Sequence, residues 1–125
     1  MKWVLSIILA VISSVASAEY KDWDQWDKEM FWTTTAMMAV DHLTTRDMAS
    51  RYDEGYTEDW NSWMLGERPD KDTVDLFFLV NYITHYYITD YIQHDEHRAW
   101  YLTARFVISG GAAVNNLTLG LGLRF

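Results

Sequence analysis

The chain has 125 residues, a formal net charge of −8 at pH 7 and no cysteine. Its length fits one small domain, and the lack of cysteine excludes a disulfide scaffold, a lipoprotein anchor and a thiolate metal site. The acidic balance argues against a nucleic-acid partner, because phosphate groups need clustered Lys and Arg. Aromatic residues reach 16%, and such enrichment favours a membrane interface or a ligand groove.

Residues 1–18 have the pattern of a bacterial signal peptide. Lys2 supplies a positive charge, residues 3–15 are apolar except for serines, and residues 16–18 (Ala-Ser-Ala) are small residues of the kind that signal peptidase recognises. The apolar core of about 13 residues is shorter than the roughly 20 that span a bilayer, which argues against a retained transmembrane helix. We therefore expect a signal peptide over 1–18 and a single domain over 19–125. The expected location is the bacterial cell envelope, with the inner membrane favoured and the outer membrane as the alternative.

The mature chain begins with an acidic segment that leads into a predicted helix over residues 30–49. In this first segment Trp23 and Trp26 alternate with acids, which fits either a solvated lead-in or an interfacial segment with its indoles at headgroup level. No Gly or Pro interrupts the helix that follows. Its second half carries Asp41 and Thr45, which lie four residues apart and therefore share a face.

A linker over residues 52–73 separates this helix from the strongest apolar segment, residues 74–93. That segment has about the 20 residues that a bilayer-spanning helix needs, and its continuous apolar runs favour a helix over a strand. Asn81, His85 and Thr89 recur every four residues, which places one polar stripe on an otherwise apolar helix.

A third helix is predicted over residues 99–117. Its small residues at 109–113 would let helices approach closely in a membrane, and Arg105, Ser109 and Asn116 fall near one face. Beyond it, Leu alternates with Thr, Gly and Arg up to Phe125, and this period of two predicts an extended tail. The predicted fold is therefore all-α, with about three membrane-associated helices after an N-terminal signal peptide and a short extended C-terminal tail.

Several short motifs are distributed along nearly all of the mature chain. They comprise Asp41, Thr45 and Arg46, then Leu65, Gly66 and Pro69, then His85, and finally Asn115, Asn116, Gly120 and Phe125. In order and spacing they resemble a family of small, uncharacterised, signal-peptide-bearing bacterial membrane proteins. The pattern of that family reads Asp-Trp-x-Gln-Thr-Arg, Asn-Pro-x-Leu-Gly with a later Pro, a mid-helix His, and Asn-Asn-x-x-x-Gly before a terminal Phe. His42, Thr44 and Ser62–Trp63 depart from it at the Trp, Gln and Asn-Pro positions. The resemblance implies a helical membrane protein and no particular activity.

Each predicted helix thus carries polar residues on an apolar background. Ionisable groups at membrane depth are costly, so they normally face a bundle interior and pair with one another. We expect an internal polar cluster in which Asp41, His85 and Arg105 neutralise one another and an asparagine closes the network. The full set of predicted cluster residues is Asp41, Thr45, Asn81, His85, Arg105, Asn115 and Asn116.

Two interpretations of this polar cluster remain open. In the first it is structural, and it specifies the register and packing of the helices. In the second it binds a proton, a cation or a polar headgroup, with His85 as the titrating group because an imidazole changes charge near neutral pH.

Motifs for catalysis are absent from the sequence. It contains no His-Glu-x-x-His, no Gly-x-Ser-x-Gly and no phosphate-binding glycine loop, so it predicts neither catalytic residues nor a cofactor. Asp90, His94 and His97 could hold a divalent ion at one helix end, although solvated loops carry such residues routinely.

The leading functional expectation is a non-enzymatic structural or interaction component of a membrane. Its expected partners are membrane lipid and either another protein or a second copy of the chain. One alternative is an intramembrane site protein or enzyme that handles a proton, a cation or a headgroup. Another is an outer-membrane protein that uses Phe125 as an assembly signal, because such proteins end in an alternating apolar segment with a terminal Phe.

Overall fold

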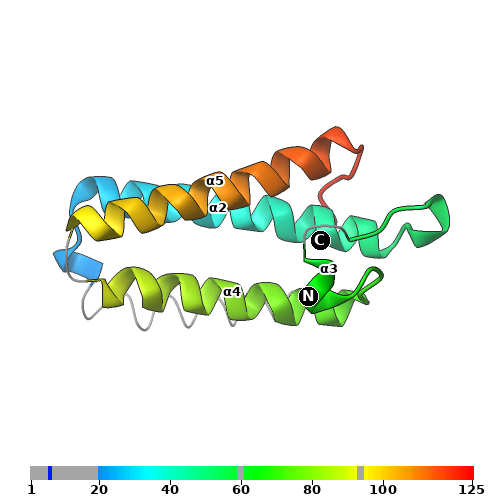
Figure 1. Ribbon diagram of the computed structural model, residues 1–125, viewed down its shortest axis with the longest axis horizontal. Helices are drawn as coiled ribbons and strands as arrows, with labels where there is room; N and C mark the ends of the chain where they lie inside the picture. Colours follow the sequence, from blue (N-terminus) through cyan, green and yellow to red (C-terminus); the bar gives the residue numbers. More distant parts are fainter. Residues whose placement is uncertain (1–5, 7–19, 59–60, 93–94) are drawn as a thin grey trace.

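The computed structural model describes Ser6 and residues 20–58, 61–92 and 95–125. Three long helices dominate this part of the chain: α2 (Gln25–Ala49), α4 (Lys71–Tyr91) and α5 (Asp95–Thr118) (Figure 1). The shorter elements are the 3-10 helices η1 (Tyr20–Asp22) and η2 (Tyr52–Glu54) and the one-turn helix α3 (Ser62–Leu65). No strand occurs in the described ranges, so the all-α prediction is confirmed. Apart from Ser6, the predicted signal peptide lies outside them.

All three long helices begin earlier than predicted, and in α2 and α4 an aspartate caps the earlier start. The Asp24 side chain accepts a hydrogen bond of 2.7 Å from a backbone N–H in the first turn of α2, and Asp70 does the same in α4. Such caps satisfy backbone donors that have no partner inside the helix. The sequence prediction instead started both helices at their first apolar residues, Met30 and Val74.

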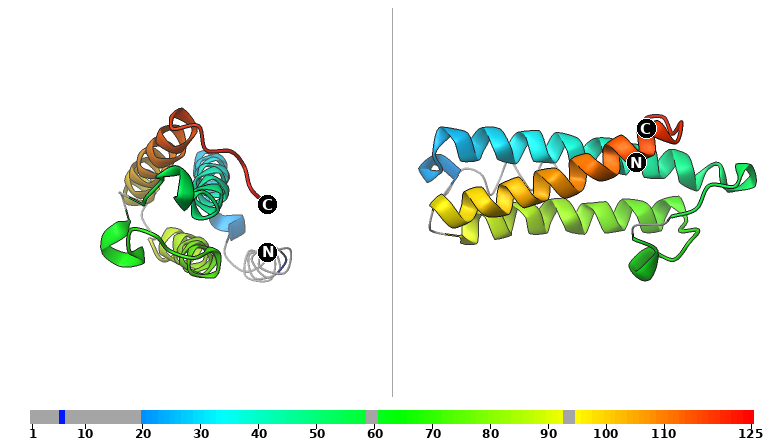
Figure 2. Two further views of the ribbon diagram at one scale, coloured as in Figure 1. Left: turned by 90° about the vertical axis from the view of Figure 1, so that its right-hand side faces the viewer. Right: turned by 45° about the horizontal axis from the view of Figure 1, so that its top comes forward.

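The long helices run side by side, and α2 contacts both of the others (Figure 2). It packs extensively against α5 and less extensively against α4, whereas α4 and α5 contact each other little. In Figure 1, α5 starts beside the end of α4 and then diverges from it. A cavity lined by all three helices lies between the diverging parts.

Two clusters of buried side chains hold the helices together. One cluster comprises Trp23, Phe31, Tyr86 and Leu102, and the other comprises Met38, Val74, Phe78 and Tyr82. Each cluster joins α2 to α4, and Leu102 adds α5 to the first. Complete burial of one such side chain contributes roughly 1.5–3 kcal/mol relative to its exposure, so these contacts supply much of the driving force for folding.

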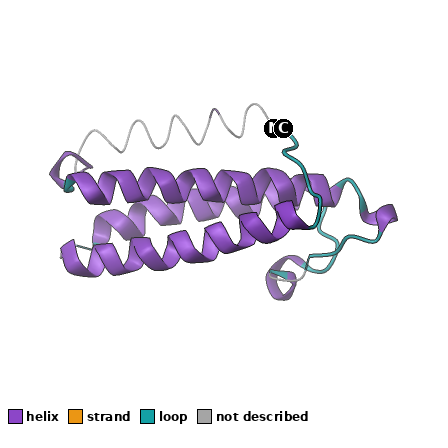
Figure 3. Cartoon of the chain, turned by 90° about the horizontal axis from the view of Figure 1, so that it is seen from above, coloured by secondary structure: helices purple, strands orange, loops and turns teal. Residues whose placement is uncertain are grey.

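The C-terminal segment, residues 121–125, has no regular secondary structure and lies along α2 (Figure 3). The backbone N–H of Gly122 donates to the Asp47 carboxylate at 2.8 Å, and that of Arg124 donates to the Leu43 carbonyl at 3.2 Å. The helix before it ends at Thr118, and the chain then turns at Gly120, whose φ of 86° suits a residue without a side chain. The alternating Leu and Gly residues thus terminate α5 and dock the tail on α2.

None of the helices in the described part of the chain combines the length and the apolar character that crossing a membrane requires. Charged residues enter each long helix, such as Asp27 in α2, Asp75 in α4 and Arg105 in α5. The predicted membrane association therefore finds no support in the hydropathy of these helices.

Candidate functional site

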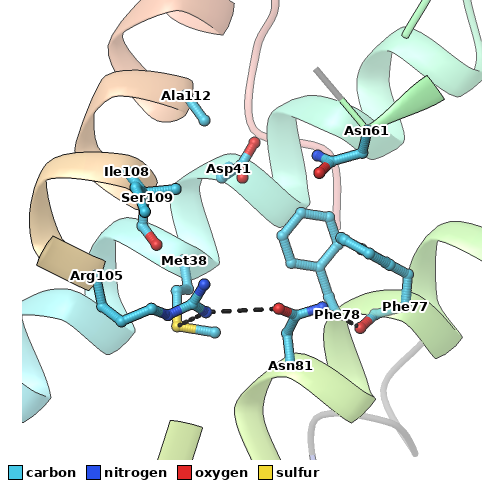
Figure 4. Close-up of a pocket in the computed structure, with 10 residues that line it drawn as sticks. All are labelled: Met38, Asp41, Asn61, Phe77, Phe78, Asn81, Arg105, Ile108, Ser109 and Ala112. Atoms are coloured by element: carbon cyan, nitrogen blue, oxygen red, sulfur yellow. Dashed lines mark hydrogen bonds between the residues drawn. The ribbon is translucent and has the colours of Figure 1, made fainter. Parts of the chain in front are cut away.

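A partly open cavity of about 70 Å³ lies between α2, α4 and α5 (Figure 4). Each helix contributes one strongly polar side chain to it: Asp41 from α2, Asn81 from α4 and Arg105 from α5. The remaining lining residues are Met38, Asn61, Phe77, Phe78, Ile108, Ser109 and Ala112. Three of the residues that the sequence predicted to form an interior polar cluster therefore line one cavity.

Arg105 is held only by long and weak contacts. Its Nη2 donates to Asn81 Oδ1 at 3.5 Å and to Met38 Sδ at 3.6 Å, and its buried Nε has no hydrogen-bond partner. The Tyr101 phenol also lies near Arg105. Burial raises the pKa of Tyr101, and the charge on Arg105 partly offsets this rise. Within the described residues no carboxylate lies within 4.0 Å of the guanidinium. A guanidinium has five N–H donors, so this cation is poorly satisfied.

Asp41 accepts all of its hydrogen bonds on one carboxylate oxygen. Asn116 Nδ2 donates to Asp41 Oδ1 at 3.0 Å, and Thr45 Oγ1 donates to the same atom at 3.4 Å. The other oxygen, Oδ2, accepts no hydrogen bond from the described residues. Asn116 also donates to Thr44 Oγ1 at 2.9 Å, so it ties the end of α5 to α2.

Burial raises the pKa of Asp41 from 3.8 to about 7. The Glu58 carboxylate raises this pKa further, whereas the hydrogen bonds from Thr45 and Asn116 and the charge on Arg105 lower it. Desolvation disfavours the charged form of an acid, and here it outweighs the favourable contacts. Asp41 is therefore a carboxyl group that exchanges its proton near neutral pH.

His85 does not line the cavity and packs instead between the aromatic side chains of Phe31 and Tyr101. It is 1% exposed, it stacks on Phe31 with 4.7 Å between ring centroids, and its Nδ1 lies 3.2 Å from the Tyr101 hydroxyl. Burial lowers the pKa of His85 to about 4, and the nearby Arg105 cation lowers it as well. The imidazole is neutral at pH 7, so Asp41 takes the titrating role that the sequence had suggested for His85.

Not every residue of the predicted polar cluster belongs to the hydrogen-bond network around the cavity. Thr45 and Asn116 reach the cavity through their hydrogen bonds to Asp41. The Asn115 side chain makes no hydrogen bond within the described residues, whereas its neighbour Asn116 does. Consecutive residues on a helix point about 100° apart, so only one of the two asparagines can face α2.

Near the start of α2, a buried ion pair that the sequence prediction missed joins Asp27 to Arg98. Arg98 Nη1 donates to Asp27 Oδ2 at 3.0 Å, and its Nε donates to the Thr89 carbonyl at 3.0 Å. The Nη2 of the same side chain donates to the Ile92 carbonyl at 2.7 Å. Arg98 thus neutralises a buried carboxylate and satisfies carbonyl groups at the end of α4.

A second buried network joins α2 to the first turns of α4. His42 Nε2 lies 2.8 Å from Asp75 Oδ1, and Arg46 Nη1 donates to the other oxygen of Asp75. His42 also stacks on Phe78, with 4.7 Å between ring centroids. Burial lowers the pKa of His42, although the contact with Asp75 raises it in part.

The candidate metal ligands Asp90, His94 and His97 are only partly covered by the described residues. No group of His, Asp or Glu residues there could hold a metal ion. His94 lies outside the described residues, and Asp90 accepts a hydrogen bond of 3.1 Å from Trp23 Nε1. Trp23 is itself 4% exposed, so it belongs to the core and to neither a solvated lead-in nor a headgroup layer.

Comparison of the chain with protein-family models, with curated proteins and with solved structures gives no match. The chemistry of the cavity follows from its lining. It offers a cation, an acid that titrates near neutrality, and the Ser109 hydroxyl, which has no hydrogen-bond partner among the described residues. Such a set can bind an anion and exchange a proton.

Proposed function

We propose that the protein is a membrane-bound structural or interaction component of the bacterial cell envelope and that it contacts lipid through a charge-free band. The band consists of the exposed faces of residues 30–40 in α2, 76–89 in α4 and 99–118 in α5. These three stretches contain one charged residue, Arg105, and it is half-buried beside the cavity between the helices. This separation of charge from the outer surface is the observation that carries the proposal.

Large apolar side chains cover the band. The most exposed are Leu76, Val80, Tyr87, Ile88, Trp100, Val107, Ile108, Val114 and Leu117. Exposed apolar side chains gathered on the outer faces of several helices are typical of surfaces that bind lipid or protein. The fourteen residues of the α4 stretch span about 21 Å, at about 1.5 Å per residue. The proposal concerns contact with lipid and does not require that any one helix cross the bilayer.

Exposed aromatic residues mark both boundaries of the band. Trp26 and Tyr91 lie at the end of the bundle where α2 starts and α4 finishes, and Trp63 and Phe125 lie toward the opposite end, near α3 and the C-terminus (Figure 1). Trp and Tyr are enriched where a membrane meets water, because their rings are apolar and their N–H or O–H groups are polar.

Lipid fits this surface better than a single protein partner does. The band covers the outer faces of three helices, with Trp32 on α2, Val80 on α4 and Val107 on α5 all exposed. A partner of ordinary size would cover one patch of about 800 Å² and leave the other faces in water. Lipid can cover every face at once.

The contacts between motif residues also support membership of the family that the sequence resembles. The hydrogen bond from Asn116 to Asp41 joins the last motif to the first. The Tyr52 hydroxyl donates to the Pro69 carbonyl, which holds the second motif beside η2. We propose that the chain is a member of that family and that residues 1–18 direct its export.

Flotation with lipid vesicles tests the lipid contact. We expect the mature protein to float with vesicles of phosphatidylethanolamine and phosphatidylglycerol. Val80→Glu and Val107→Glu should each weaken binding, because a charge in hydrocarbon costs about 2.5–3.5 kcal/mol, which is roughly a hundredfold in partitioning. Thr73→Glu is the matched control, since Thr73 is exposed seven residues before Val80 on the same face of α4 but lies at its charged end. Equal flotation of all three variants, or no flotation of the native protein, would contradict the proposal.

One observation keeps the outer-membrane alternative open. Phe125 is 77% exposed, whereas Leu121 anchors the tail at 3% exposure, so the terminal ring is free to be recognised by assembly factors. Deletion of Phe125 should leave the fold unchanged. If the native protein is recovered in the outer membrane and the deletion variant is not, Phe125 acts as an assembly signal and the outer-membrane alternative is favoured. If both proteins are recovered equally in the inner membrane, that alternative is rejected.

A further inference from the structure

Arg105 differs from the other interior arginines in its partners. Arg98 faces Asp27 and Arg46 faces Asp75, each in a direct ion pair. Arg105 has no such pair within the described residues. Arg105 is half-buried at the cavity wall, so its cation lies beside this space without a carboxylate that pairs with it directly.

The residues that could compensate Arg105 do so poorly. Asp41 lines the same cavity, but it makes no ion pair with Arg105, and its pKa of about 7 leaves it partly protonated at neutral pH. Asn81 and Met38 offer a neutral oxygen and a thioether at 3.5 and 3.6 Å. None of these three neighbours places a negative charge within hydrogen-bond distance of Arg105.

Two further unused polar groups belong to the cavity walls. Ser109 is 5% exposed and lines the cavity, and its hydroxyl makes no hydrogen bond within the described residues. Asp41 Oδ2 also accepts none, although Asp41 Oδ1 is fully engaged. Both groups belong to side chains that line the cavity, so they are available to hydrogen-bond a ligand there.

We propose that this cavity binds a small monocarboxylate, of the size of formate or acetate, between Arg105 and Asp41. The guanidinium would donate charge-assisted hydrogen bonds to the carboxylate, as in other Arg–carboxylate pairs. Ser109 would donate a further hydrogen bond, and the protonated Oδ2 of Asp41 would donate to the second carboxylate oxygen. Asn81 Oδ1 positions the guanidinium.

The volume of the cavity suits a small ligand. A water molecule occupies about 30 Å³ in the liquid, so a space of about 70 Å³ holds two or three waters or an organic acid of three or four heavy atoms. Its apolar walls, Phe77, Phe78 and Ala112, suit the hydrogen or methyl group of formate or acetate. A planar carboxylate also matches the planar guanidinium better than a tetrahedral anion does.

Binding is coupled to the protonation of Asp41, because two carboxylates cannot share this space unless a proton lies between them. Three groups face Asp41 from the surrounding elements. Glu58 precedes α3 and raises the pKa of Asp41, Arg105 on α5 lowers it, and Tyr82 on α4 stays neutral because burial raises its own pKa. The affinity should therefore be constant well below pH 7 and fall about tenfold per pH unit above it.

Isothermal titration calorimetry of the purified mature protein with sodium acetate tests the site. We expect saturable binding at pH 6, weaker binding at pH 8, and none for acetamide, chloride or phosphate at equal ionic strength. Arg105→Gln should abolish binding, whereas the matched control Arg124→Gln, at an exposed arginine on the tail, should not change it. Asp41→Asn mimics the protonated carboxyl group, so it should retain binding and remove the dependence on pH.

A second variant covers the case in which Arg105→Gln does not fold. Ser109→Val fills part of the cavity and removes a donor without changing any charge, and it should weaken acetate binding at least tenfold while the circular dichroism spectrum stays native. No acetate binding at pH 6, equal binding of acetate and acetamide, or a pH dependence that persists in Asp41→Asn would overturn the proposal. Because this titration contains no vesicles, its outcome is independent of the lipid contact.

Discussion

Replacement of Asp41 by asparagine should stabilise the protein in alkaline solution and leave its stability nearly unchanged in acid. Asparagine keeps an oxygen that can accept the hydrogen bonds from Asn116 and Thr45, and it removes a buried negative charge. The gain should appear only at pH values where Asp41 is ionised in the folded protein.

The sign and size of this effect follow from the pKa of Asp41. In the unfolded chain its carboxyl group loses its proton near pH 3.8, whereas in the folded protein it keeps the proton up to about pH 7. The folded state binds more protons between these values, so its stability falls as the pH rises through them. At about 1.4 kcal/mol per pH unit, the interval of about three units sets a ceiling of about 4 kcal/mol. Partial contact with solvent reduces this, and we expect a gain of about 1–3 kcal/mol at pH 8.5.

Chemical denaturation of both proteins at pH 4 and pH 8.5, followed by tryptophan fluorescence, measures the difference. The lowered pKa values of His42 and His85 make the folded state more stable as the pH rises, which is the opposite sign, but they act equally in both proteins. Asp53→Asn, at an exposed acid of η2, is the control and should have no effect at either pH. A gain in Asp41→Asn that is the same at both pH values, or a loss at pH 8.5, would refute the reasoning.

Three further substitutions test the buried polar contacts. Arg98→Met should cost about 3–5 kcal/mol in denaturation, because it leaves a buried carboxylate without its cation, and a cost below 1 kcal/mol would show that the pair is not buried. Asp75→Asn should lower the pKa of His42 further, since the contact with Asp75 now raises it, and a titration by NMR that shows a higher pKa would be inconsistent with the network. Burial alone would raise the pKa of Asp47, but hydrogen bonds from Gly122 and two arginines outweigh it and lower the pKa. Asp47→Asn should therefore speed hydrogen exchange at the Gly122 amide without affecting α2, and unchanged exchange would mean that the tail docks by other contacts.

The sequence located the helices because apolar periodicity is a property of each segment on its own. It missed the starts of α2 and α4, since Asp24 and Asp70 are polar residues that act through backbone contacts. The same limit applies to the tail. The alternating Leu and Gly residues predicted an extended segment, but they carry no information about the surface on which it docks.

The polar cavity was partly predictable for a related reason. Asp41, Asn81 and Arg105 stand out as polar groups within apolar helices, so their meeting in the interior could be expected. His85 shares the stripe of Asn81, yet it lies one helical turn, about 5.4 Å, further along α4 and therefore belongs to the next layer of the bundle.

The buried ion pairs could not be predicted. With 18 acidic and 10 basic side chains, many pairings are possible, and the partners Asp27 and Arg98 lie 71 residues apart. Only the folded arrangement of the helices selects one of these pairings.

The central claim is that the charge-free band faces lipid. Paramagnetic broadening of methyl NMR signals, with the protein in lipid nanodiscs, tests it most directly. A nitroxide on the lipid acyl chains should broaden the signals of Val80, Val107 and Val114, and a water-soluble gadolinium chelate should leave them sharp. The opposite result, broadening of the same valines by the chelate and none by the lipid label, would contradict the account.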